Sequence, residues 1–131
     1  MTYLLDTGVW LWSLREPERM GRKARGVMAD LNQQVFLSAA TSWEIAIKAG
    51  AGKLIFPEPA GSYVPRRMVD QGLRPLPISH AHTLAVAALP HHHGDPFDRL
   101  LIAQANLEGM TLITADRMFE KYSVEILWAG R

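Results

Sequence analysis

Hydrophobic residues fall along the chain in short apolar runs that alternate with longer segments in which apolar positions recur at helical spacing. Short runs bounded by turn residues are typical of buried strands, and the longer segments are typical of packed helices. The pattern predicts strands at 3–5, 35–37, 73–78, 110–114 and 124–127. It predicts helices at 9–14, 21–31, 41–49, 63–70, 79–89 and 97–108, and a helical turn at 116–122.

Proline and glycine refine this pattern. Gly109 ends the segment 97–108, which is the clearest helix in the chain. Pro75 and Pro77 interrupt the strand predicted at 73–78. Because proline cannot donate a ladder hydrogen bond, that strand is expected at a sheet edge or at a strand end. Strands repeatedly separated by helices predict an α/β fold, a sandwich with a mainly parallel central sheet.

Composition narrows the class of protein further. The 131 residues are 48% hydrophobic and 21% charged, with a mean hydropathy of -0.03, which predicts one globular domain over residues 1–131. The absence of cysteine excludes disulfides, thiolate nucleophiles and cysteine-based metal sites, and it favours a cytoplasmic location. No signal peptide or membrane span is visible. A net charge of +1 is too small to indicate nucleic-acid binding by itself.

Four acidic residues follow or flank the predicted strands. Asp6 ends the first strand, Asp116 follows the strand at 110–114, Glu44 lies beyond the strand at 35–37, and Asp98 opens the clearest helix. Ligands of such sheets bind beyond the carboxyl ends of the strands. Four acids gathered at one edge repel one another unless protons or a cation compensate. The sequence therefore predicts a divalent metal site.

Each acid also has a structural interpretation. Asp95, followed by proline, fits a helix N-cap, which makes Asp98 a partner of the helix dipole. The segment from Thr41 to Glu44 matches a capping box. Asp116, which follows the strand at 110–114, can cap the last helical turn. Capping explains Asp6 less well, because that residue is expected near the middle of the sheet, where burial favours a bound cation.

Four sequence motifs, found in the expected order along the chain, resemble those of one known protein family. They are YLLDTGVWLW, SAATSWEIAIKAGAGKL, HHGDPFDRLLIAQA and LITAD, and together they cover almost the whole chain. The chain resembles the PIN-domain ribonucleases, and most closely the VapC-like toxins of bacterial type II toxin-antitoxin pairs. The resemblance implies a PIN-like α/β/α sandwich.

The resemblance also implies a set of site residues. The metal-binding and catalytic acids would be Asp6, Glu44 and Asp98, with Asp116 as a fourth, more variable acid, while Asp95 keeps its capping role. The possible supporting residues are Thr7, Thr114, His93 and Arg99.

By resemblance the reaction is endoribonucleolytic hydrolysis of RNA by metal-bound water, leaving a 5′-phosphate and a 3′-hydroxyl. An all-oxygen set of carboxylates suits Mg²⁺ or Mn²⁺ better than zinc or copper. The implied partners are the RNA substrate, a cognate VapB-like antitoxin and a second copy in a homodimer. A helical pair early in the chain would receive the antitoxin, assisted by the basic cluster at 15–25, which is otherwise an ordinary solvated face.

The histidines are further candidates for metal binding, and the tryptophans are candidates for base stacking. His91, His92 and His93 are adjacent in a predicted loop, so their side chains point in different directions and a shared ion is not expected. His93, nearest Asp95, is expected to order the loop or to meet RNA. His80 and His82 are interpreted as structural. Core packing is the favoured interpretation of Trp10 and Trp43, and Trp12 is a candidate for a protein interface.

Two other enzyme classes fit poorly. A haloacid-dehalogenase-like phosphatase needs a second aspartate two residues after Asp6, where this chain has Gly8. A receiver-like phospho-acceptor domain needs adjacent acids near the first strand and a lysine near the last, and neither pattern is clear. The alternative that stays open is a catalytically inactive PIN-fold protein that acts as a binding partner or scaffold.

Overall fold

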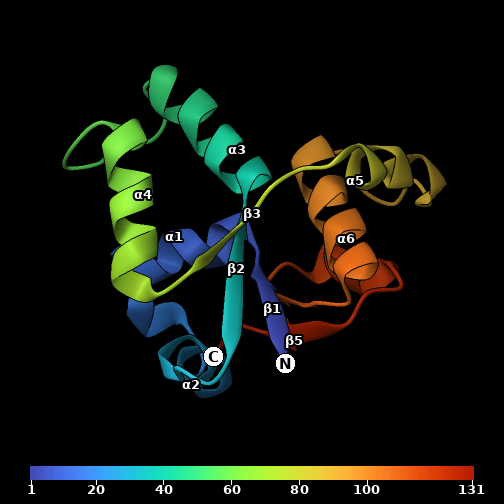
Figure 1. Cartoon of the computed structure of the whole chain (residues 1–131), viewed down its shortest axis with the longest axis horizontal. Helices are drawn as coiled ribbons and strands as arrows, with labels where there is room; N and C mark the ends of the chain where they lie inside the picture. Colours follow the sequence, from blue (N-terminus) through green and yellow to red (C-terminus); the bar gives the residue numbers. More distant parts are fainter.

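A five-stranded parallel sheet forms the centre of the computed structural model, which describes all residues, 1–131 (Figure 1). The strands are β1 (Thr2–Leu5), β2 (Gln34–Ser38), β3 (Arg74–Leu76), β4 (Thr111–Thr114) and β5 (Ile126–Trp128). Their order across the sheet is β3-β2-β1-β4-β5, and all four pairings are parallel. The predicted parallel sheet is confirmed, with β1 in its middle and the proline-containing β3 at an edge.

Six α-helices connect and cover the strands. They are α1 (Thr7–Arg15), α2 (Arg22–Ala29), α3 (Ala39–Gly50), α4 (Ala60–Gln71), α5 (His80–Ala85) and α6 (Pro96–Glu108). Three short 3₁₀ segments complete the chain: η1 (Pro17–Arg19), η2 (Val86–Ala88) and η3 (Arg117–Lys121). The helix predicted at 79–89 is thus divided into α5 and η2. No helix is long and apolar enough to cross a membrane.

Two apolar clusters lie on opposite faces of the sheet. In β1, Tyr3 and Leu5 belong to the cluster covered by α1, α2 and α4, whereas Leu4 belongs to the cluster covered by α6 and η3. Alternate strand residues point to opposite faces, so a fully apolar β1 indicates a strand buried on both sides. The three layers confirm the predicted α/β/α sandwich.

Two local predictions are wrong. Helix α3 begins at Ala39, and its N-cap is Ser38, whose Oγ accepts a hydrogen bond from the Ala40 amide at 2.9 Å. The predicted capping box therefore does not form, because its first residue already lies inside the helix. Trp43 was expected in the core but is 58% exposed, with its ring packed edge-to-face on Phe97 at 5.0 Å. Its position on α3 directs it away from the sheet.

The interpretation of His82 as structural agrees with its contacts. His82 is buried, and its Nδ1 accepts a hydrogen bond from the Ser79 amide at 3.0 Å. The Ser79 hydroxyl accepts in return from the His82 amide, which completes a capping box at the start of α5. His82 Nε2 lies 2.8 Å from Glu108 Oε2 and so links α5 to the end of α6.

Candidate active site

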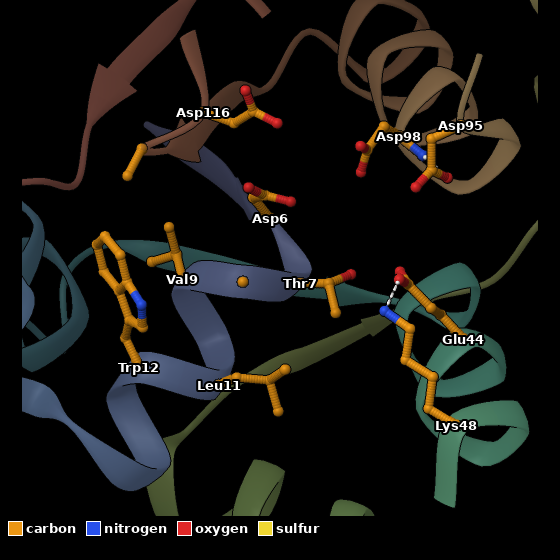
Figure 2. A pocket seen from close by; sticks show the side chains of 12 residues that line it. Asp6, Thr7, Val9, Leu11, Trp12, Glu44, Lys48, Asp95, Asp98 and Asp116 are labelled. Atoms are coloured by element: carbon orange, nitrogen blue, oxygen red, sulfur yellow. Dashed lines mark hydrogen bonds and ion pairs between the residues drawn. The ribbon is translucent and has the colours of Figure 1, made fainter. Parts of the chain in front are cut away.

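The carboxyl ends of the central strands border one acidic pocket (Figure 2). Five acids line it, contributed by the end of β1, α3, the start of α6 and the segment after β4: Asp6, Glu44, Asp95, Asp98 and Asp116. The four acids singled out in the sequence are therefore brought together from positions more than 100 residues apart. This is the crevice in which parallel sheets of this class bind their ligands.

Asp6 directly follows the central strand β1 and is only 8% exposed. Its amide continues the sheet by donating to Ile113 O at 2.9 Å. Its side chain makes no capping bond to α1 and instead accepts from Thr114 Oγ1 at 2.8 Å. Burial raises the pKa of Asp6 to about 7, although the Thr114 hydrogen bond opposes the shift, and the negative charges of Asp98 and Asp116 raise it further.

Glu44 reaches the pocket from α3 and is also 8% exposed. Its Oε2 accepts from Lys48 Nζ at 2.7 Å, one helical turn further along α3. That hydrogen bond raises the pKa of Lys48. The other oxygen, Oε1, is buried and has no hydrogen-bond partner. A buried, unpartnered carboxylate oxygen is unfavourable unless it meets a proton or a cation.

Asp95 and Asp98 have different roles at the start of α6: Asp95 caps the helix, and Asp98 faces the pocket. Asp95 Oδ1 accepts from the amides of Phe97 and Asp98 at 2.8 and 3.3 Å, which confirms its predicted capping role. The carboxylate of Asp98 is therefore free to face the pocket, where His93 Nε2 lies 2.8 Å from its Oδ2. Burial and the neighbouring charge of Asp95 raise the pKa of Asp98 to about 6, against the opposing effect of His93.

Asp116 lies on the exposed side of the pocket. It caps η3, with Oδ1 accepting from the Met118 amide at 2.9 Å, as predicted for this acid. Its own amide donates to Thr114 Oγ1 at 3.0 Å, so one hydroxyl connects Asp116 with Asp6. His93, Asp98 and Asp116 each offer one ligand atom, and these three atoms lie within 4.8 Å of one another.

The remaining supporting candidates separate into two groups. Thr7 lines the pocket, and its Oγ1 pairs with Thr41 Oγ1 at 2.9 Å. Arg99 does not line the pocket: it is buried and donates to the backbone oxygens of Val86, Leu89 and Pro90 at 2.8–3.3 Å. The guanidinium therefore fixes the chain that leads into the histidine loop and does not face the acidic pocket.

Two of the three adjacent histidines stay away from the acids. The His92 ring packs edge-to-face against Tyr122 at 5.3 Å, and neither His91 nor His92 lines the pocket. Only His93 faces an acid. The expectation that the three imidazoles do not share one ion agrees with this arrangement.

Lys48 is a pocket residue that the sequence reasoning missed. It follows Glu44 by four residues on a predicted helix, a spacing at which opposite charges meet on one helix face. The signal was thus present in the sequence. Such pairs are common on solvated helix surfaces, however, and only the fold reveals that this pair lines the acidic pocket.

The donor set fits a hard divalent cation. Every acid offers carboxylate oxygen, the ligand that Mg²⁺ and Mn²⁺ prefer, and Glu44 Oε1 is buried without a partner. The raised pKa values of Asp6 and Asp98 show that the ionised pocket is electrostatically unfavourable by itself. A cation bound among these acids would remove that penalty.

Comparisons with known proteins agree with this geometry. A ribonuclease of Mycobacterium tuberculosis named VapC22 is 30% identical over 123 residues, which cover 92% of each chain. A second ribonuclease from the same organism, named VapC16, is 49% identical over 61 residues. This match covers 47% of the present chain and 43% of the relative.

Solved structures share the fold at lower sequence identity. A VapBC2 crystal structure from Rickettsia felis, bound to a promoter DNA fragment, has a TM-score of 0.76 and 18% identity and covers 98% of this chain and 99% of the other. A DNA-bound VapBC from Salmonella typhimurium has a TM-score of 0.72 and 17% identity, with 98% of each chain covered. The family model described as PIN domain matches residues 3–125. The chain belongs to the PIN-domain family.

Proposed function

We propose that this protein is a metal-dependent endoribonuclease, the toxin of a type II toxin-antitoxin pair, with residues 1–131 as a single PIN domain. One observation carries the proposal. Carboxylates from four separate parts of the chain meet at the carboxyl edge of the sheet, where two of them have raised pKa values and one has an unpartnered oxygen. The ribonuclease names of the two Mycobacterium relatives support the reaction class.

In this proposal Asp6, Glu44, Asp98 and Asp116 hold Mg²⁺ or Mn²⁺ and form the catalytic set. The bound ion would supply a water nucleophile at neutral pH and stabilise the charge that develops on the leaving oxygen. The chain's own residues orient this set. Thr114 fixes one oxygen of Asp6, and the capping bond of Asp95 leaves Asp98 free to turn into the pocket.

His93 and Arg99 act as positioning residues in the same proposal. His93 holds Asp98 from the loop side through the 2.8 Å contact of its Nε2. Arg99 anchors the preceding backbone by donating to the carbonyl oxygen of Pro90 at 2.8 Å, and it so limits the positions that the histidine loop adopts. Partners that lock ligand side chains in place commonly tune metal sites.

The proposal also names two protein partners, an antitoxin and a second copy of the chain, and a location in the cell. The two solved structures of the same fold described above are VapBC complexes, which supports a VapB-like antitoxin as the cognate partner. We further propose a homodimer, and a cytoplasmic location in which the RNA substrate is available. Co-expression with the product of an adjacent small gene, followed by size-exclusion chromatography with light scattering, tests both assemblies.

Cleavage of a labelled RNA pool tests the nuclease function. Wild-type protein with Mg²⁺ or Mn²⁺ is compared with Asp6→Asn, Asp98→Asn and an EDTA-treated sample. Asp30→Asn is the matched control, because Asp30 is exposed and outside the pocket. We expect cutting by wild type and Asp30→Asn, and none by the pocket variants or with EDTA. Equal cutting by all folded variants, or none by wild type, would refute the proposal and favour an inactive PIN-fold scaffold.

A further inference from the structure

The acidic pocket contains one permanently charged basic side chain. Of the twelve residues that line it, five are acids, and Lys48 is the only lysine or arginine. An RNA strand is a polyanion, so five carboxylates repel it as it approaches unless a positive group faces the strand. Lys48 is the side chain of the pocket wall with the charge to attract a phosphate.

The position of Lys48 suits this task. Its Nζ lies 2.7 Å from Glu44 Oε2, and Figure 2 shows the ammonium beside the Glu44 carboxylate. The Lys48 side chain is 45% exposed, whereas that of Glu44 is 10% exposed. The ammonium is therefore reached from solvent at the mouth of the pocket, while the carboxylate lies deeper.

The hydrogen-bonding capacity of Lys48 is not used up by Glu44. An ammonium group carries three N–H donors, and Glu44 Oε2 is its one hydrogen-bond partner. Glu44 in turn offers Lys48 only one of its two oxygens, because Oε1 has no partner. A cation at Oε1 and an ammonium at Oε2 thus occupy different oxygens, and both are compatible with one position of the Glu44 side chain.

We propose that Lys48 is a substrate-binding residue, whose ammonium donates to a phosphate oxygen of the RNA at the mouth of the pocket while it keeps its contact with Glu44. The inference rests on the proposed nuclease function and assigns a phosphate contact to that same site. A compact ammonium on a flexible stem contacts phosphate as a point charge, so the contact adds affinity for RNA of any sequence.

The competing interpretation is a simple brace, in which Lys48 only holds Glu44 as an ion pair within α3. The two interpretations predict different results for Lys48→Met, which keeps most of the length of the side chain and removes the charge. Loss of a phosphate contact lowers the dependence of RNA binding on salt. Loss of a brace leaves that dependence unchanged and loosens Glu44, which weakens metal binding.

Fluorescence anisotropy with a labelled single-stranded RNA of random sequence measures the first effect. All proteins carry Asp98→Asn, which under the proposed function prevents cutting. We expect Lys48→Met to reduce the slope of log Kd against log [KCl] by about 0.7, the value for one phosphate contact on a single strand. Lys48→Arg should restore the slope. Lys53→Met, an exposed lysine outside the pocket, should keep the original slope.

Calorimetric titration with Mn²⁺, without the Asp98→Asn change, measures the second effect. Removing a positive charge beside Glu44 should leave the Mn²⁺ affinity of Lys48→Met equal to that of wild type or tighter. An unchanged salt slope overturns the inference, and weaker Mn²⁺ binding together with that unchanged slope identifies the brace. If wild type shows no metal-dependent cutting of the same RNA, the nuclease function itself is wrong. An unchanged slope with intact cutting refutes only the role of Lys48.

Discussion

Replacing Asp6 by asparagine should stabilise the metal-free protein at alkaline pH. Asp6 is 8% exposed, and burial raises its pKa from 3.8 to about 7. At pH values between these two pKa values, the Asp6 carboxyl is protonated in the folded protein and ionised in the unfolded chain. The free energy of unfolding therefore falls as the pH rises from about 4 to 7, and above that window the folded protein carries a buried, uncompensated charge.

The structure sets the size of the effect. A shift of about three pKa units corresponds to about 4 kcal/mol between the two protonation states, since each unit contributes 1.36 kcal/mol. Asparagine keeps an oxygen that can accept from Thr114, but its buried amide N–H groups lack a partner, which costs about 1–3 kcal/mol. We expect a net gain of about 1–3 kcal/mol at pH 8, or roughly 3–10 °C in Tm.

Thermal unfolding in EDTA at pH 5, 6, 7 and 8 provides the assay. The gain of Asp6→Asn over wild type should be largest at pH 8 and shrink towards pH 5, where the Asp6 carboxyl is protonated in the folded protein. Asp30→Asn should show no such trend, because Asp30 is exposed. Mg²⁺ at pH 8 should stabilise wild type more than Asp6→Asn. A variant that is less stable at pH 8, or a gain independent of pH, would show that burial does not perturb Asp6 in this way.

Three further predictions follow from other contacts. If Asp6 and Asp98 hold the ion as proposed, protons compete with it, so Mn²⁺ affinity measured by calorimetry should fall at least about tenfold from pH 7.5 to 5.5, and a flat profile would contradict the raised pKa values. Arg99→Met should lower the free energy of unfolding in urea by about 2–4 kcal/mol, because it removes three hydrogen bonds from the buried guanidinium to backbone carbonyl oxygens, and an unchanged midpoint would refute this. Gly21→Ala would place a Cβ 2.6 Å from Gly130 O, so a loss of about 1–3 kcal/mol is expected in the same assay, whereas Gly26→Ala meets no neighbour and should not destabilise the fold.

The sheet and its acidic edge were predictable from the sequence because apolar runs and acids occupy fixed places relative to one another. A run as short as residues 3–5, followed directly by Asp6, predicts a buried strand with an acid at its carboxyl end. The family resemblance selected Asp98 over Asp95. The structure supplies the reason in hydrogen bonds, since Asp95 satisfies two amides at the start of α6.

The start of α3 and the place of Trp43 were not predictable from local pattern. Thr41 and Glu44 have the spacing of a capping box, but Ser38 is an equally good cap, and the sheet register decides between them by ending β2 at Ser38. Trp43 is apolar, yet its direction follows from the orientation of α3 against α6, where it meets Phe97. Such tertiary choices are made by packing between distant segments.

The same acids that make the pocket suitable for a cation also make the metal-free protein less stable. The Asp6 side chain does not cap α1 and instead accepts a hydrogen bond from the Thr114 hydroxyl. Glu44 leaves one buried oxygen unpartnered, whereas the acids with purely structural duties, such as Asp95, satisfy backbone amides. Acids selected for stability alone would cap helices as Asp95 does. Under the proposed function, a bound cation completes the interactions of these unsatisfied and desolvated acids, and its binding should raise the free energy of unfolding.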